Sequence, residues 1–404
     1  MARTASRRPR SASPAAAAPS AAPAIRGPAW LIPLTALAGL SGLTLSPAIA
    51  GQPHLVRAFL ATAAILAAWL ALTALLAHRR HAPLAFRLDL RPQHYVQACA
   101  HLSIYAYWAS YWGEVGRAAP LILAQLLFAY AFDALLTWSR GEVYTLGFGP
   151  FPIIFSTNLF LWFRPDWFEL QFLMVAVGFA AKALIRWTRD GRRVHIFNPS
   201  SFTLSLFSVA LILAGRSDIT WGPQIAVTQL LPPHMYLLIF LVALPGQFLF
   251  GVAAMTLAAV ATTFAFTLTY STVTGAHYFI EPSIPIAVFL GMHLLFTDPS
   301  TAPRSELGRI VFGVLYAVSV ILLFSLLQRA GVNFLFVCLL VIGVVTWRRT
   351  RHPERKPLPD GGENLAATIS PQTAMEQFNE AVALMENSKY DGAAEKFREL
   401  EQAI

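Results

Sequence analysis

Long apolar runs alternate with short polar or basic connections along most of this chain. A helix of about 20 apolar residues crosses the hydrocarbon core of a bilayer, so each run predicts one membrane-spanning helix. Several runs are short or contain proline, so we expect an all-α polytopic membrane protein with about 10–12 transmembrane helices. The predicted spans are 29–49, 55–77, 94–112, 118–137, 149–164, 168–186, 199–214, 236–252, 254–272, 283–296, 309–327 and 331–347.

The two ends of the chain differ from this apolar region. Residues 1–27 consist mainly of Ala, Pro, Ser and Arg, a composition that predicts a disordered basic tail ahead of the transmembrane domain at 28–347. Residues 348–370 form a polar linker, and 371–404 show helical spacing with a "KYDGAAEKF" turn similar to a tetratricopeptide repeat. Because one hairpin cannot bury its apolar faces alone, we expect it to bind a protein partner or to belong to a longer array. An unspecific amphipathic helical pair is the alternative.

Composition agrees with the hydropathy pattern. The 404 residues are 56% hydrophobic and only 13% charged, whereas soluble domains carry about 25% charged residues. The formal net charge of +9 comes from the tail and from loops beside apolar runs, which is typical of topology signals and not of a nucleic-acid surface. We expect a multi-pass protein of the bacterial inner membrane, and with twelve spans the basic clusters predict that both termini lie in the cytoplasm. These clusters are 79–91, 186–193 and 347–356.

Soluble-enzyme motifs are missing from the sequence. No P-loop, G-x-S-x-G elbow or zinc-ligand spacing occurs, and Cys99 and Cys338 lie in separate apolar runs, so we expect no metal site. Ionisable residues at membrane depth are costly, which singles out Asp133, Lys182 and Glu281. We interpret these three as residues near the ends of spans. His94 and His101 stand two turns apart on one predicted helix, and we interpret them as interfacial histidines.

Two polar-Pro-Ser turns adjoin apolar runs one hundred positions apart. The first seam is Asn198-Pro199-Ser200-Ser201, and the second is Thr297-Asp298-Pro299-Ser300-Thr301. Asn, Asp and Ser cap helix N-termini and Pro suits the first turn, so each seam predicts a helix start. Their repetition predicts two related halves, and helix N-termini at membrane depth would offer an anion site at their interface. Capping alone is the alternative. Pro245-Gly246-Gln247 predicts a broken helix nearby.

The same seams carry a resemblance to a known family. "HIFNPSSFTLSLF" and "FTDPSTAPRSELGRIVFGVLYAV" resemble motifs of the NqrB/RnfD family, the membrane flavin subunits of sodium-translocating NADH:quinone reductase and of Rnf complexes. The resemblance covers roughly residues 90–347 and is nearest to divergent relatives, some found near enediyne gene clusters and some with tetratricopeptide tails. It implies FMN esterified to a threonine in an external S/T-G-A-T-like stretch, which corresponds here to 217–234.

The resemblance assigns candidate cofactor-binding residues. Thr228 occupies the position of the esterified threonine, with Thr220 as a weaker candidate, but the glycine of the motif is missing. Since β-branched Val227 disfavours the tight turn that esterification needs, we predict non-covalent FMN, or none, over an ester. The cofactor-binding candidates taken together are Thr228, Asn198, Ser200, Asp298 and Thr301.

The resemblance also implies a function. We expect an integral membrane subunit of an electron-transport complex, with flavin held between its transmembrane helices. The subunit alone would not be a complete enzyme, and the complex would couple electron transfer to ion transport. Its partners would be the lipid bilayer, other subunits of the complex and a protein bound by the C-terminal hairpin. Two alternatives are a transporter-like protein that kept the fold without covalent flavin, and a membrane anchor presenting an interaction repeat.

Overall fold

A computed structural model describes residues 25, 27–90, 92–189, 192–230, 234–279, 284–299 and 301–329. The chain divides into two units, 1–352 and 353–404, and every described residue belongs to the first. Several predicted features lie outside the described residues: 1–24 and 26 of the basic tail, Glu281, Cys338, the span at 331–347, the linker and the tetratricopeptide-like hairpin.

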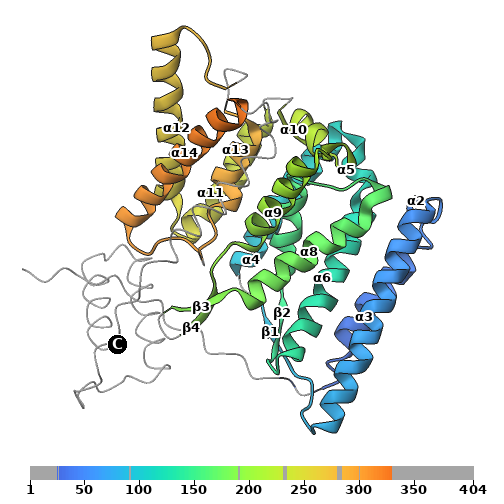
Figure 1. The fold of residues 1–404 in the computed structure, drawn as a ribbon. Coiled ribbons are helices and arrows are strands. Elements are labelled where there is room, and N and C mark those ends of the chain that lie inside the picture. The colour runs from blue at the N-terminus through green and yellow to red at the C-terminus, as the bar shows by residue number, and fades with distance from the viewer. Residues whose placement is uncertain are drawn as a thin grey trace, which may run out of the picture. The chain divides into compact units, whose positions relative to one another are not determined.

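Helices dominate the described part of the chain (Figure 1). The first ten are α1 (Leu31–Leu43), α2 (Pro47–Ala50), α3 (Pro53–Arg79), α4 (Pro92–Tyr111), α5 (Gly113–Arg117), α6 (Ala119–Ser139), α7 (Pro150–Asn158), η1 (Pro165–Trp167), α8 (Phe168–Leu184) and α9 (Pro199–Ala214). The remainder are η2 (Ser217–Ile219), α10 (Gly222–Leu230), α11 (His234–Leu249), α12 (Ala253–Thr274), α13 (Ile286–Leu290), the π-helical turn η3 (Gly291–Leu295) and α14 (Glu306–Arg329).

The prediction of a mostly helical chain with apolar helices of membrane-spanning length is confirmed, whereas the number of 10–12 transmembrane helices stays a prediction. Within the described ranges, five helical segments are long and apolar enough to cross a bilayer, or six if α10 and α11 form one bent span. Helices α1, α9 and the α13–η3 segment are apolar but shorter. Two predicted spans contain shorter helices than expected. The nine residues of α7 are the only helix in the predicted span 149–164, and α13 and η3 are the helical segments in 283–296.

The helices pack in two groups. In the first, α6 contacts α1, α3, α7 and α8, and α8 continues to α9. In the second, α12 packs along α14, while η3 contacts both α11 and α12. Helix α4 joins the groups because it packs against α7 of the first and α11 of the second. Both groups contain a long helix, a short one and another long one in chain order: α6–α7–α8 and α12–α13/η3–α14.

Four short strands, which hydropathy did not predict, lie in the connections. Strand β1 (Phe86–Asp89) pairs in parallel with β2 (Tyr144–Gly147), and β3 (Arg186–Arg189) pairs antiparallel with β4 (Arg192–His195). Figure 1 shows both pairs at the same end of the first helix group. Burial opposes ionisation of Glu142, but Arg140 and Arg186 outweigh it and hold the pKa of this carboxyl below its usual value. This cluster therefore ties the β2 loop to the β3 strand.

Candidate functional site

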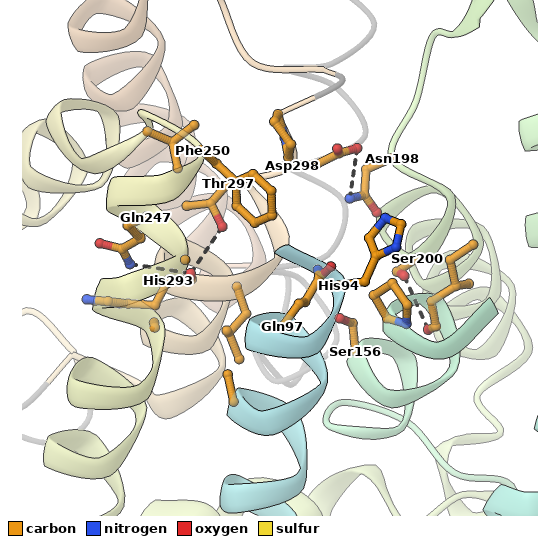
Figure 2. Close-up of a pocket in the computed structure, with 18 of the residues that line it drawn as sticks. His94, Gln97, Ser156, Asn198, Ser200, Gln247, Phe250, His293, Thr297 and Asp298 are labelled. Carbon is orange, nitrogen blue, oxygen red and sulfur yellow. Dashed lines mark hydrogen bonds between the residues drawn. The ribbon is translucent and has the colours of Figure 1, made fainter. Parts of the chain in front are cut away.

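The two seams meet in space. Asn198 Nδ2 lies 3.4 Å from Asp298 Oδ2 and 3.3 Å from the carbonyl oxygen of Leu295, so it donates across the boundary between the helix groups. His195 Nε2 approaches the same Asp298 oxygen at 3.5 Å. Figure 2 shows Asn198 and Asp298 turned toward each other. Residues one hundred positions apart thus form one polar junction.

The junction lines a cavity of about 340 Å³, which we call the seam pocket. A volume of this size lies within the usual range for small-molecule sites, about 300–1,000 Å³. Its apolar walls include Val96 of α4, Ile153 of α7, Val242 of α11 and Phe250 in the turn after α11. Its polar lining includes His94, Gln97, Ser156, Gln247 and His293 (Figure 2). Lys182 also lines it.

Positive groups converge on the first-group side of the seam pocket. The N-terminus of α9 enters the lining with Pro199 and Ser200, and Asn198 Oδ1 caps it by accepting the Ser201 N–H at 3.0 Å. A Cβ atom placed on Gly149, the residue before α7, would lie 3.7 Å from Lys182 Nζ. The Lys182 ammonium therefore lies beside the N-terminus of α7. Two helix N-termini and one ammonium group favour an anion here.

Carboxylates balance part of that charge. Lys182 Nζ lies 4.0 Å from Asp133 Oδ2, so these two residues form a pair, whereas the sequence predicts only that each lies near the end of a span. Asp298 faces His195 in the same way. Positively and negatively charged side chains therefore both lie around the seam pocket. The ammonium of Lys182 lies on the side where α7 and α9 begin.

Backbone packing fixes the polar lining of the second group. Gln247 Nε2 donates to the carbonyl of His293 at 3.4 Å, and Thr297 Oγ1 donates to the same carbonyl at 3.1 Å (Figure 2). In the first group, Ser200 Oγ donates to the carbonyl of Ile153 at 3.3 Å. His101 Nε2 and Ser156 Oγ lie 2.9 Å apart behind the lining. Each group thus holds its polar side chains in place before any ligand enters.

The two seams differ in local structure, contrary to the sequence prediction. Asn198 begins α9 as expected, but no helix begins at Pro299 in the described chain, because α14 starts only at Glu306. Asp298 instead follows η3, and its backbone carbonyl accepts the Ala302 N–H at 2.9 Å. The predicted break at Pro245 is also wrong: α11 runs through this proline, and the turn comes at Gly251, where φ is +63°.

Thr228 lies outside the seam pocket. It belongs to the last turn of α10, whereas the sequence analysis expected a loop. Its Oγ1 accepts the Trp108 indole N–H at 3.1 Å and donates to the Gln224 carbonyl at 2.8 Å. A phosphate ester would remove that donor and the helix provides no tight turn, so covalent flavin does not fit at this residue.

The other threonine candidates have structural contacts. Thr301 is 8% exposed and its Oγ1 donates to the Asp298 carbonyl at 3.2 Å, so it shapes the turn behind the seam pocket. Thr220 is 1% exposed and its Oγ1 donates to the Ser217 carbonyl at 2.9 Å. Of the five cofactor-binding candidates, Asn198, Ser200 and Asp298 line the seam pocket, whereas Thr228 and Thr301 do not.

Several lining residues escaped sequence reasoning. Gln97 and Ser156 look like isolated polar residues in apolar runs, and the signal that marks them is the cost of a polar side chain at membrane depth.

Comparison with models of known protein families and with curated proteins found no match to this chain.

Proposed function

We propose that this chain is an integral membrane subunit of an electron-transport complex of the NqrB/RnfD type, with FMN held non-covalently in the seam pocket. The observation that carries the proposal is the 3.4 Å contact between Asn198 and Asp298, because both motifs that resemble the family meet at one cavity. Other subunits would supply and accept the electrons, and the C-terminal hairpin would bind a protein partner.

The lining of the seam pocket supports FMN as the ligand. Phe250 and Val242 offer apolar surface to a planar ring, and Gln97 and Gln247 offer amide groups to its polar edge. Lys182 and the start of α9 would hold the phosphate. Bound there, FMN would supply the redox chemistry, while the protein binds it, orients it and sets the electrostatics.

A flavin-binding experiment tests this proposal. The protein purified in detergent should release flavin on denaturation, and protein stripped of flavin should bind added FMN with quenching of flavin fluorescence. Ala243→Trp fills the seam pocket and should abolish binding, because Ala243 is 4% exposed and lines it. Leu241→Trp on the same helix is the control, since Leu241 is 53% exposed and absent from the lining.

The phosphate contact has its own test. Lys182→Gln combined with Asp133→Asn removes both charges of this partly buried ion pair, so neither charge is left without its partner. This double variant should weaken the binding of FMN about tenfold. The binding of riboflavin, which lacks the phosphate, should be unchanged. If neither flavin binds the parent protein, the electron-transport proposal is wrong.

One observation favours a transporter as the second candidate function. Helices α7 and α13–η3 are too short to cross a bilayer, yet both line the seam pocket between the helix groups. Discontinuous helices at such an interface are typical of transporters. Flux of a small solute into proteoliposomes that contain this chain alone, without bound flavin, would support this candidate over the first.

A further inference from the structure

A second cavity, of about 380 Å³, lies in the first helix group. We call it the amide pocket, because Gln125, Asn158 and Gln171 line it with their carboxamides. All three are at most 1% exposed. They come from α6, α7 and α8, so the three helices that form the centre of this group all contribute. None of these residues lines the seam pocket.

The three carboxamides form one hydrogen-bonded network. Gln125 and Asn158 exchange bonds, with Gln125 Nε2 donating to Asn158 Oδ1 at 3.1 Å and Asn158 Nδ2 donating back at 2.7 Å. Gln171 Nε2 donates to Gln125 Oε1 at 2.9 Å, and Gln171 Oε1 accepts the Phe163 N–H at 3.0 Å. The network therefore connects α6, α7 and α8 through their carboxamides.

The network leaves hydrogen-bonding capacity beside the cavity. A carboxamide has two N–H donors and two acceptor lone pairs. Among the described residues, Gln125 Nε2 and Gln171 Nε2 each use one donor, while Asn158 Oδ1 and Gln171 Oε1 each accept one bond. Each amide atom of the network has at least one partner, as buried polar atoms normally do, and the second N–H of Gln125 and of Gln171 is left for a molecule in the cavity. That molecule must both accept and donate hydrogen bonds.

Aromatic side chains form much of the remaining lining. Trp162, Phe163, Phe168 and Trp221 line the amide pocket, and Trp162 stacks on Trp112 with ring centroids 5.6 Å apart. The ionisable residues in the lining are Glu114 and Arg117, which pair with each other and are partly or largely exposed. A charged ligand would therefore find no unpaired partner in the buried lining.

We propose that the amide pocket binds an uncharged, hydroxylated ring, such as a sugar, either free or as a lipid headgroup. Neighbouring hydroxyls donate and accept at once, which matches the spare N–H groups and lone pairs of the amide network. Tryptophan and phenylalanine faces suit the C–H surface of such a ring. A ring that carries carbonyl oxygens alone would use the donors and leave the acceptors of Asn158 and Gln171 without partners.

Binding should be measured in phosphatidylcholine nanodiscs, because common detergents carry sugar headgroups. Saturation-transfer NMR with glucose, galactose and inositol should give ligand signals from the parent protein. Nanodiscs that contain a glucosyl diacylglycerol should suppress these signals if the natural ligand is a headgroup. Unchanged signals would identify the free sugar.

Three variants test the site. Ala48→Phe places a ring in the lining at an exposed position, so it should fold normally and weaken sugar binding about tenfold or more. Gln125→Met and Gln171→Met should have the same effect. Gln247→Met is the matched control, because Gln247 is a buried amide of the seam pocket. This variant should weaken FMN binding and leave sugar binding intact. The proposal of FMN in the seam pocket and that of a sugar in the amide pocket can therefore fail separately.

The proposal is overturned if none of the three ring compounds binds the parent protein, or if Ala48→Phe leaves their binding unchanged. It is also overturned if riboflavin, and no sugar, gives signals that Ala48→Phe removes.

Discussion

At the scale of single residues, Asn198 has two contacts that differ in kind. Its Oδ1 caps α9 through the Ser201 N–H, while its Nδ2 reaches Asp298 in the other helix group. The first contact was predictable from sequence, because Asn before Pro marks a helix start. The second was a hypothesis that only the tertiary structure supports.

Two substitutions separate these contacts. Asn198→Ala loses both and should lower the free energy of unfolding by about 0.5–2 kcal/mol, the usual cost of a lost cap. Asn198→Asp keeps the cap acceptor but sets a carboxylate against Asp298, so it should loosen the junction between the groups. Thermal unfolding in detergent, with and without FMN, measures both effects. Equal behaviour of Asn198→Asp and the parent protein would show that the contact with Asp298 contributes nothing.

The limits of residue-level prediction have a physical cause. Asn198, Ser200 and Asp298 were identifiable because local capping chemistry leaves a sequence pattern. Thr228 was misplaced because the connection at 217–234 is polar enough to suggest a loop, yet it folds into η2 and α10. The network of Gln125, Asn158 and Gln171 was not predictable, because the three residues lie on different helices. No local sequence spacing indicates that they contact one another.

At the scale of elements, small residues set the distance between helices. A Cβ on Gly313 of α14 would lie 2.3 Å from the backbone oxygen of Met255 in α12, so these two helices touch backbone to backbone. In membrane bundles such close approach relies on small residues. Gly178 of α8 is different, because a Cβ there would meet its neighbours at 3.5 Å, an ordinary contact distance.

This contrast gives a matched pair of variants. Gly313→Ala should destabilise the protein by about 1–3 kcal/mol, since α12 and α14 must separate to admit the methyl group. Gly178→Ala should be neutral or stabilising by up to about 1 kcal/mol, because alanine is the better helix former. Unfolding temperatures in one detergent provide the comparison, and a tolerated Gly313→Ala would contradict the packing of these two helices.

The Glu142 cluster provides a pH-dependent link between loops. Since the pKa of Glu142 is lowered in the folded state, its contribution to stability is present above the unfolded pKa and is lost as pH falls through the folded value. With an unfolded glutamate pKa of about 4.3, the loss occurs below roughly pH 4. Glu142 is 40% exposed, so solvent screening limits the contribution to about 1 kcal/mol or less.

Glu142→Gln tests this link. The parent protein should lose slightly more stability than the variant when the pH is lowered from 7 to 3.5, because glutamine does not titrate. Asp166→Asn, a change at an exposed carboxylate, serves as the control. Parallel pH profiles of the parent and Glu142→Gln would rule out a role for the cluster.

At the scale of the whole molecule, hydropathy predicted the long helices well and the short ones poorly. The predicted span 199–214 matches α9 residue for residue, because Asn-Pro and Gly215 mark its ends. At 149–164 the run stays apolar after α7 ends, but the chain leaves the helix at Leu159 and Gln171 accepts the Phe163 N–H. A buried irregular segment and a helix have the same hydropathy, so only packing distinguishes them.

Orientation in the membrane is a testable consequence of the basic clusters. Arg79 ends α3 and Arg186 begins β3, so both lie at the end of the first helix group where the strands are found. We predict that this end of the group and both termini face the cytoplasm. Single cysteines at Thr188 and Ser217, placed in a chain lacking Cys99 and Cys338, should label differently with a membrane-impermeant maleimide. Ser217 should react in intact cells and Thr188 only after lysis. The reverse pattern would invert the topology.

The parallel pairing of β1 with β2 has a consequence for biosynthesis. Phe86 pairs with Tyr144, so β1 leaves the ribosome before α4, α5 and α6 have been made and stays without its partner until they have. At about 5–20 residues per second, that interval is several seconds long. During it, the first hairpin of the nascent chain carries an unpaired strand edge outside the bilayer, exposed to chaperones and to neighbouring chains. This small sheet can close once β2 has been made, before α7, α8 and α9 of the first helix group have left the ribosome.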